Sequence, residues 1–259
     1  GDAVYPPVRD IAPLDLLEHE YKQMHHNDTI GYKRFLESTN ATVFGIYDDH
    51  DFGGNDRGHE MPDKQARARL FWKFLENNRT FPHDTRQGLY YSVQWKNAKV
   101  VFLDTRYHRQ HHCIPSVAGK FPLGAGIACL TRWISAGLLN KFCTSSPQNA
   151  ILGPEQWEWF EHQLMDNEND NNTSNELLIV VSSIQVLTTN PAMESWGHFP
   201  EERRRLLQML LQQSQQVILL SGDVHYGEIS SPFPNHPVQY LEITSSGMTH
   251  DCKKNIYGS

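Results

Sequence analysis

Hydrophobic residues recur along the chain at two spacings, which predict helices and strands. Apolar positions three and four residues apart are typical of helices packed on one side, and short apolar or alternating runs are typical of strands. Helices are predicted over Leu14–His25, Gly31–Glu37, Pro62–Asn77, from Pro154 past Leu164, and over Pro200–Gln213. Strands are predicted over Thr42–Tyr47, Gly88–Trp95, Lys99–Asp104, Leu177–Val181, Val217–Leu220, Gly227–Ser231 and Val238–Thr244. This mixture indicates an α/β domain.

The hydrophobic spacing that predicts helices and strands breaks down in two stretches of the chain. Residues Tyr107–Asn149 are rich in His, Gly, Pro and Ser with one apolar piece, so we interpret them as an insertion that forms a lid or rim. One hypothesis is that His108, His111, His112 and Cys113 are ordinary loop residues, because histidine is common in irregular loops. The alternative is that they bind a metal. Asp166–Asn175 is polar throughout and is predicted to be a solvated loop. Neither an internal repeat nor a linker interrupts the chain, which predicts one domain.

Composition excludes some classes of protein. The chain has 259 residues, of which 39% are hydrophobic and 20% charged, as in an ordinary globular protein of one large domain. The net charge of −7 argues against a nucleic acid as a dedicated partner, because clustered Lys and Arg bind phosphate backbones. The sequence also lacks a stretch of the length expected for a transmembrane helix.

Cysteines and glycosylation sequons leave the compartment open. Five sequons permit N-glycosylation, at Asn27, Asn40, Asn78, Asn171 and Asn172. The four cysteines lack a CxxC spacing, which disfavours a zinc knuckle and leaves two disulfides or reduced thiols as alternatives. One hypothesis is a glycoprotein that is secreted or lies in the secretory-pathway lumen, and the other is a soluble intracellular protein.

Polar residues gather where predicted strands end. Tyr47–Asp56 contains four carboxylates, one imidazole and one amide in ten positions, directly after an apolar run. Asp2 at the start and Ser221–His225 near the end also follow apparent strand ends. Each stretch alone is compatible with a polar turn. Together they predict one metal centre at the carboxyl edge of a sheet, because carboxylates and imidazoles bind divalent and trivalent ions.

Several motifs occur in the order seen in one enzyme family. They are Gly1-Asp2-x-x-Tyr5, Asp48-Asp49-His50-Asp51, Leu103-Asp104-Thr105-Arg106, Gly153-Pro154-x-Gln156-Trp157, Ser182-Ser183-Ile184-Gln185 and Ser221-Gly222-Asp223-Val224-His225. The chain thus resembles the alkaline phosphatase D (PhoD-like) metallophosphatases. The resemblance implies a calcineurin-like four-layer α/β/β/α sandwich with two mixed sheets. It also implies a phosphoric ester hydrolase that acts on a phosphate-ester substrate with a metal-activated hydroxide at a dinuclear or multinuclear site.

The resemblance further implies roles for individual residues. Metal ligands are expected at Asp2, Tyr5, Asp49, Asp223 and His225, with Asp2 as the bridge between two ions and Tyr5 as a phenolate ligand. The expected ions are Fe³⁺ with Ca²⁺, although other divalent ions are compatible with these ligands. An organic cofactor is not expected.

Two further residues are expected to act on the substrate. The resemblance assigns His50 to the departure of the leaving oxygen or to polarising the substrate. Arg106 either binds the substrate phosphate with two hydrogen bonds or pairs with Asp104 in a buried bridge. Asp51 and Asn55 are candidates for ligands or for supporting partners.

The chain also departs from the family pattern. The family's first metal motif and its strand precede the Gly1-Asp2 turn and have no counterpart in this sequence, so we expect a contact with an N-terminal segment that supplies them. Ser183 or Gln185 occupies the place of the superfamily's middle histidine. Two alternative functions therefore remain, a phosphodiesterase or phospholipase D-like hydrolase and a catalytically silent binding protein.

Overall fold

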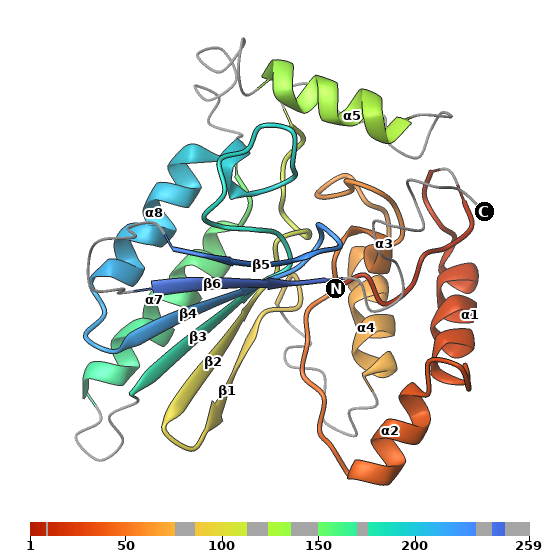
Figure 1. Ribbon diagram of the computed structural model, residues 1–259, viewed down its shortest axis with the longest axis horizontal. Helices are drawn as coiled ribbons and strands as arrows, with labels where there is room; N and C mark the ends of the chain where they lie inside the picture. The colour runs from red at the N-terminus through yellow and green to blue at the C-terminus, as the bar shows by residue number, and fades with distance from the viewer. Residues whose placement is uncertain are drawn as a thin grey trace.

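A computed structural model describes residues 1–8, 10–75, 86–112, 124–135, 150–169, 176–231 and 240–246 (Figure 1). The helices in these ranges are α1 (Leu14–His25), α2 (Tyr32–Thr39), α3 (Asp49–Phe52), α4 (Lys64–Phe74), α5 (Gly124–Trp133), α7 (Pro154–Asn169), η2 (Trp196–His198) and α8 (Pro200–Leu211). The strands are β1 (Tyr91–Trp95), β2 (Ala98–Leu103), β3 (Leu177–Ser182), β4 (Gln216–Ser221), β5 (Gly227–Ser230) and β6 (Tyr240–Ser245). The predicted α/β class is confirmed.

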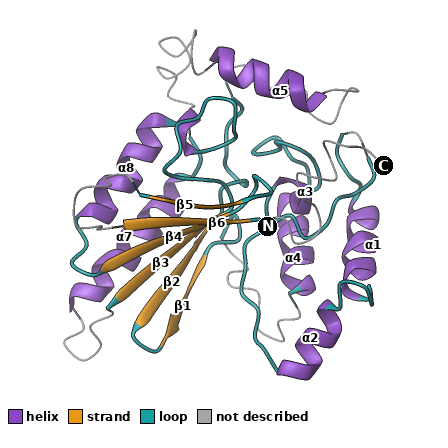
Figure 2. Ribbon diagram, in the orientation of Figure 1, coloured by secondary structure: helices purple, strands orange, loops and turns teal. Residues whose placement is uncertain are grey.

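The strands form one mixed sheet in the order β1-β2-β3-β4-β6-β5 (Figure 2). The four inner strands are parallel, and β1 and β5 at the two edges run antiparallel to their neighbours. In this register Leu103 pairs with Ser182, and Ser221 pairs with Thr244. The polar residues that follow β2, β3 and β4 therefore emerge at the same edge of the sheet, as the sequence predicted.

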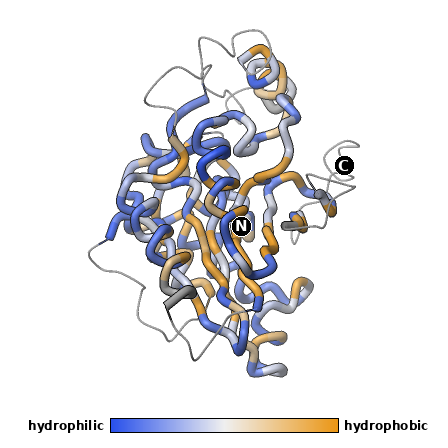
Figure 3. The backbone as a smooth tube through the Cα atoms, turned by 90° about the vertical axis from the view of Figure 1, so that its left-hand side faces the viewer, coloured by the Kyte–Doolittle hydropathy of each residue, from blue (hydrophilic) through white to orange (hydrophobic). Residues whose placement is uncertain are grey.

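Helices cover the sheet from two sides (Figure 1). Val101 and Leu103 of β2 pack in a core with α7, η2 and α8, whereas Phe102, which points to the opposite face, packs in a second core with α1, α2 and α4. Figure 3 shows hydrophobic stretches running together through the middle of the molecule, with hydrophilic ones outside. Two apolar cores therefore hold the sheet edge that carries the polar cluster.

Where a second sheet was expected, the described residues contain an extended segment and no strand ladder. Residues 42–47, predicted as a strand, cross the face of the sheet opposite α7 and α8. The backbone of this segment bonds to a side chain at Gly45. Gly45 N donates to the Tyr91 hydroxyl over 3.0 Å, and this hydroxyl donates to Gly45 O over 2.8 Å. A cavity of about 960 Å³ between this segment and apolar residues of β2 and β3 shows that this sheet face is incompletely covered by the described residues.

Most predicted elements are present, but some bounds and elements differ from the prediction. The predicted loop Asp166–Asn175 begins too early, because α7 continues to Asn169. Polar residues such as Asn and Glu lower helix stability only slightly, so a polar composition did not end the helix there. The single turn α3 was missed, although Asp48 and Asp51 form a capping box that starts it.

Parts of several predictions lie outside the described residues. The insertion is described at 107–112 and 124–135, where α5 carries Cys129; Cys113, Cys143 and Cys252 are outside. Of the sequons, Asn27 and Asn40 are exposed, and the other three are outside. Within the described ranges, every helix is too short or too polar to traverse a lipid bilayer.

Candidate metal centre

Three distant parts of the chain meet beyond the carboxyl ends of the strands. Asp2 and Tyr5 come from the first segment, Asp49 and His50 begin α3, and the loop between β4 and β5 carries Asp223 and His225. Contacts between these side chains place all six in one cluster. The structure thus brings together every predicted metal ligand and the predicted catalytic histidine.

Four carboxylates form the centre of this cluster. Asp2, Asp48, Asp49 and Asp223 each offer an oxygen, and these oxygens lie within 4.8 Å of one another. Asp48 is fully buried, and its Oδ2 lacks a hydrogen-bond partner among the described residues. Burial, together with the nearby carboxylates of Asp48 and Glu194, raises the pKa of Asp223 well above its usual value. An oxygen-rich, negatively charged set of this kind fits hard metal cations.

Tyr5 connects the first segment of the chain to the loop between β4 and β5 at this cluster. Its hydroxyl donates to Asp2 Oδ2 over 2.7 Å and lies 2.5 Å from His225 Nε2, which is itself 3.6 Å from Asp2 Oδ2. Burial and the Asp2 carboxylate raise the pKa of Tyr5, so the side chain is a neutral phenol in the absence of a cation. A bound cation would favour its ionised form, as expected for a phenolate ligand.

His50 lies at the accessible side of the cluster. Its ring lies against the Tyr5 ring, tilted by 32° with 4.1 Å between centroids, and its Nε2 is 4.0 Å from Asp49 Oδ1. A quarter of the His50 side chain is exposed, compared with 4% of the Asp49 side chain. Burial alone lowers the pKa of His50, but Asp49 and three further carboxylates outweigh it and raise the pKa above the ordinary value. The neighbouring carboxylates therefore favour the protonated form of His50, and its ring is reachable from solvent.

Three of the clustered residues have left-handed backbones. The φ angles are 59° at Asp2, 71° at Asp223 and 59° at His225. This region is unfavourable for residues that carry a Cβ atom, and strain of this kind gathers at functional sites. The fold therefore holds these three side chains in positions that their local sequence does not prefer.

Asp51 fixes the first segment against α3. Its carboxylate accepts hydrogen bonds from the backbone N–H groups of Asp2, Ala3 and Val4, the last two over 2.8 and 3.2 Å. It also accepts from Asp48 N over 3.2 Å within the capping box. These contacts use its oxygens on backbone amides, so Asp51 supports the cluster rather than facing into it.

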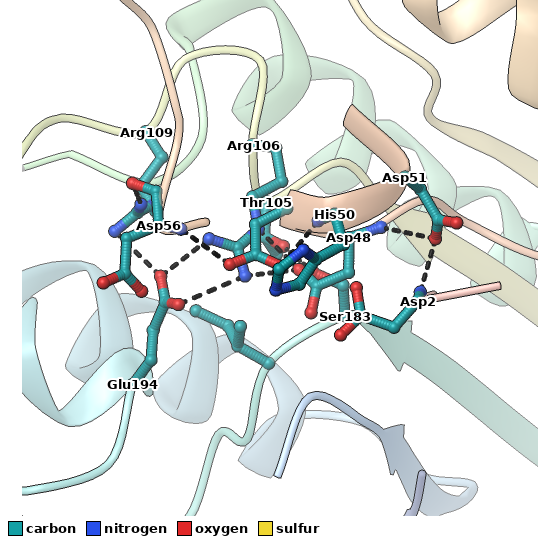
Figure 4. A network of polar contacts seen from close by, with 12 residues as sticks. Asp2, Asp48, His50, Asp51, Asp56, Thr105, Arg106, Arg109, Ser183 and Glu194 are labelled. Carbon is teal, nitrogen blue, oxygen red and sulfur yellow. Dashed lines mark hydrogen bonds and ion pairs between the residues drawn. The ribbon is translucent and has the colours of Figure 1, made fainter. Parts of the chain in front are cut away.

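Arg106 lies beside the cluster, between Asp48 and Glu194 (Figure 4). Its Nε is 2.5 Å from Asp48 Oδ1, its Nη1 is 2.7 Å from Glu194 Oε1, and the side chain has no exposed surface. Asp104 does not pair with the guanidinium, because its carboxylate accepts the backbone N–H groups of Leu89, Arg106 and Tyr107. The hypothesis of an Arg106–Asp104 bridge is therefore wrong, and in this structure Arg106 presents no open edge to a phosphate.

Some residues of the site were missed from the sequence. Asp48 belongs to the four-carboxylate group, and its position directly after residues 42–47 was the available signal. Ser183 rather than Gln185 reaches the cluster, since Ser183 Oγ donates to Asp48 Oδ1 over 2.7 Å. Glu194 lies far away in sequence and joins through Arg106, a contact that no local pattern indicates.

Clustered carboxylates, a tyrosine and two histidines at the carboxyl edge of this sheet are the kinds of ligand found in metal-dependent hydrolases. Residues 19–253 match the family model described as PhoD-like phosphatase, and the chain belongs to this family. The predicted family is confirmed, and the chain is a phosphatase whose clustered ligands indicate metal ions.

None of the curated proteins matches the chain. Among solved structures, a dimetal phosphatase from Danio rerio is similar, with 13% identity, coverage of 95% of this chain and 85% of that chain, and a TM-score of 0.46.

Proposed function

We propose that this chain hydrolyses phosphoric esters at two or more metal ions bound by Asp2, Tyr5, Asp49, Asp223 and His225, with Asp48 as a further ligand. The convergence of four carboxylate oxygens within 4.8 Å beside the Tyr5–His225 contact supports the proposal most directly. Isolated buried carboxylates at this spacing repel one another, and cations relieve that repulsion. Residues 1–259 are proposed to act as one PhoD-like domain.

The ligands divide into two groups that share Asp2. One group, Tyr5 and His225, supplies a phenol oxygen and an imidazole nitrogen next to Asp2 Oδ2. The other group is made of carboxylates alone. We propose that Tyr5 and His225 would hold Fe³⁺ and that the carboxylate group would hold Ca²⁺, because calcium prefers oxygen ligands, with Asp2 available to both. Bound ions would neutralise the phosphoryl oxygens and lower the pKa of an attacking water.

His50 is proposed to protonate the leaving oxygen. It is the exposed imidazole beside the cluster, and the surrounding carboxylates favour its protonated form. Proton transfer from a positioned imidazole contributes about 10²- to 10⁴-fold to a rate. Arg106 is proposed as a positioning residue, because it holds Asp48 and Glu194 in place without reaching the surface.

The test separates metal binding from turnover in two variants. His50→Gln should retain the metal content of the wild type and lose roughly 10²- to 10⁴-fold in kcat. Asp223→Asn should lose metal, measured by elemental analysis, together with activity. A phosphomonoester and a phosphodiester are assayed side by side, which identifies the preferred ester and tests the phosphodiesterase alternative.

The outcomes are distinct. Equal metal loss in both variants contradicts the separate roles of His50 and Asp223. A wild-type protein that binds stoichiometric metal and hydrolyses neither ester supports the alternative of a catalytically silent binding protein.

The exposed Asn27 and Asn40 sequons are compatible with the proposed secretory compartment. Mass spectrometry of glycans on the native protein tests this proposal.

A further inference from the structure

Two other groups of potential metal ligands occur in the described residues. One contains Asp56, His112 and Glu194, all buried, and the other contains His59, Glu60 and His111 near the surface. In the first group arginines already balance the carboxylates, since Arg132 contacts Asp56 and both Arg106 and Arg109 contact Glu194. The first group is therefore an internal ion-pair network, which leaves little need for a cation.

In the second group, the carboxylate has two imidazoles as neighbours and one arginine. Glu60 Oε2 lies 3.7 Å from His59 Nδ1 and 3.9 Å from His111 Nδ1, and the two imidazole rings are 4.9 Å apart. Arg57 approaches the other oxygen, Oε1, at 3.4 Å. Two imidazoles thus face one carboxylate oxygen whose local partner is the Gly58 N–H, at 3.2 Å.

These separations are close to those of a tetrahedral zinc site. Ligand atoms at about 2.0–2.1 Å from Zn²⁺ lie about 3.4 Å apart on a tetrahedron. The two separations between a histidine and Glu60 exceed this value by a few tenths of an ångström, and all three ligand atoms lie within 4.8 Å of one another, so side-chain rotations can bring them to an ion. His59 Nδ1 also lies 3.1 Å from Arg109 O, so a bound ion would replace this hydrogen bond.

The two backbone segments that carry these ligands contact each other directly. His59 N donates to Arg109 O over 2.9 Å, and a side chain at Gly58 would meet the same carbonyl oxygen at 2.3 Å. The close approach joins the loop after α3 to residues 107–112 at the start of the insertion. The ligands are therefore carried by two segments that are already fixed to each other, which lowers the entropy lost on binding.

We propose that His59, Glu60 and His111 form a Zn²⁺ site, separate from the carboxylate cluster, that clips the loop after α3 to the start of the insertion. Two imidazoles and one carboxylate favour zinc over calcium, whereas the carboxylate cluster favours calcium. Three protein ligands leave a fourth position for water. Side-chain exposures of 22–42% make the site accessible to ions in solution.

The experiment uses Co²⁺ as a spectroscopic substitute for Zn²⁺ in the full chain. Tetrahedral Co²⁺ absorbs visible light strongly, and added Zn²⁺ should displace it with loss of the band. His59→Gln and His111→Gln should each abolish the band and remove one equivalent of tightly bound Zn²⁺ in a calorimetric titration. His162→Gln, at an exposed histidine of α7, is the matched control and should keep both signals.

Further measurements distinguish this site from the carboxylate centre. Asp223→Asn should retain the Co²⁺ band, even if it loses other metal. Zn²⁺ should slow amide exchange in residues 56–60 and 107–112 of the wild type but not of His111→Gln. Unchanged Zn²⁺ binding in both histidine variants, or loss of the Co²⁺ band in Asp223→Asn alone, would overturn the proposal. Matching circular dichroism spectra of the metal-free variants exclude misfolding as the cause.

Discussion

Asp2, Asp223 and His225 share a backbone conformation that residues with side chains avoid. Left-handed φ angles at these positions allow three carboxylate or imidazole groups from opposite ends of the chain to converge. The conformation costs roughly 1–2 kcal/mol for an ordinary residue. Glycine would be the least strained residue there, but it supplies no ligand. The backbone at these positions is therefore strained because the residues there must supply ligand atoms.

We predict that the metal-free Asp223→Gly variant is more stable than Asp223→Ala. Both variants remove the same carboxylate, but only glycine relieves the left-handed strain, so the difference should be about 1 kcal/mol in the free energy of unfolding. Urea denaturation of the chelator-treated proteins measures it. At exposed Glu158 within α7, the same pair of substitutions should rank in the opposite order. Equal stability of the two Asp223 variants would contradict the role of strain.

At the scale of elements, sheet edges were predictable and contacts between loops were not. Apolar runs located the inner strands, and parallel strands bring their carboxyl ends to one edge, so the meeting of Ser183 after β3 with Gly222 after β4 followed from the pattern alone. The extended path of residues 42–47 did not follow, because a buried apolar run has the same pattern with or without a paired neighbour. Glu194 likewise depends on a tertiary contact with Arg106.

Helix α5 is attached to the rest of the protein by an ion pair with a buried carboxylate. Arg132 on α5 forms an ion pair with Asp56, whose side chain is 2% exposed. This contact fastens the described helix of the insertion to the loop after α3. Removing one partner of a buried pair is costly, because the other charge remains without compensation.

We predict that Arg132→Gln lowers the free energy of unfolding by about 3 kcal/mol and speeds amide exchange in α5. Asp56→Asn in the same chain should recover part of the loss, since it removes the uncompensated carboxylate. Arg204→Gln, which breaks the exposed pair with Glu201, should change stability by less than about 1 kcal/mol. If Arg132→Gln and Arg204→Gln had the same effect, the pair would not fasten α5.

At the scale of the whole molecule, the clustered carboxylates link stability to pH and to metal. Burial raises the pKa of Asp51 to about 7, and burial with neighbouring carboxylates raises that of Asp223 well above its usual value. Aspartates in an unfolded chain have a pKa of about 3.9. Through these two carboxyl groups the metal-free folded protein binds more protons than the unfolded chain between these values, so their contribution to stability falls as pH rises through this range.

We predict that metal-free wild type loses stability relative to Asp223→Asn as pH rises from about 5 to about 7.5. The variant cannot carry the charge that the folded site disfavours, and comparing the two cancels the titration of histidines elsewhere. Urea denaturation at both pH values, with chelator present, measures the difference. Added Ca²⁺ should reverse the trend in the wild type, because it compensates the carboxylates. A difference between the two proteins that does not change with pH would contradict this linkage.

The Tyr5–His225 contact also bears on how the protein reaches its native state. It joins residues 220 positions apart, so the loop that it closes contains most of the chain. Contacts at such separation form late, because the intervening chain must be ordered first. The ligand set is therefore complete only when both ends have docked on the finished sheet. Partly folded chains would then lack a complete centre, and metal binding would select for molecules that have completed folding.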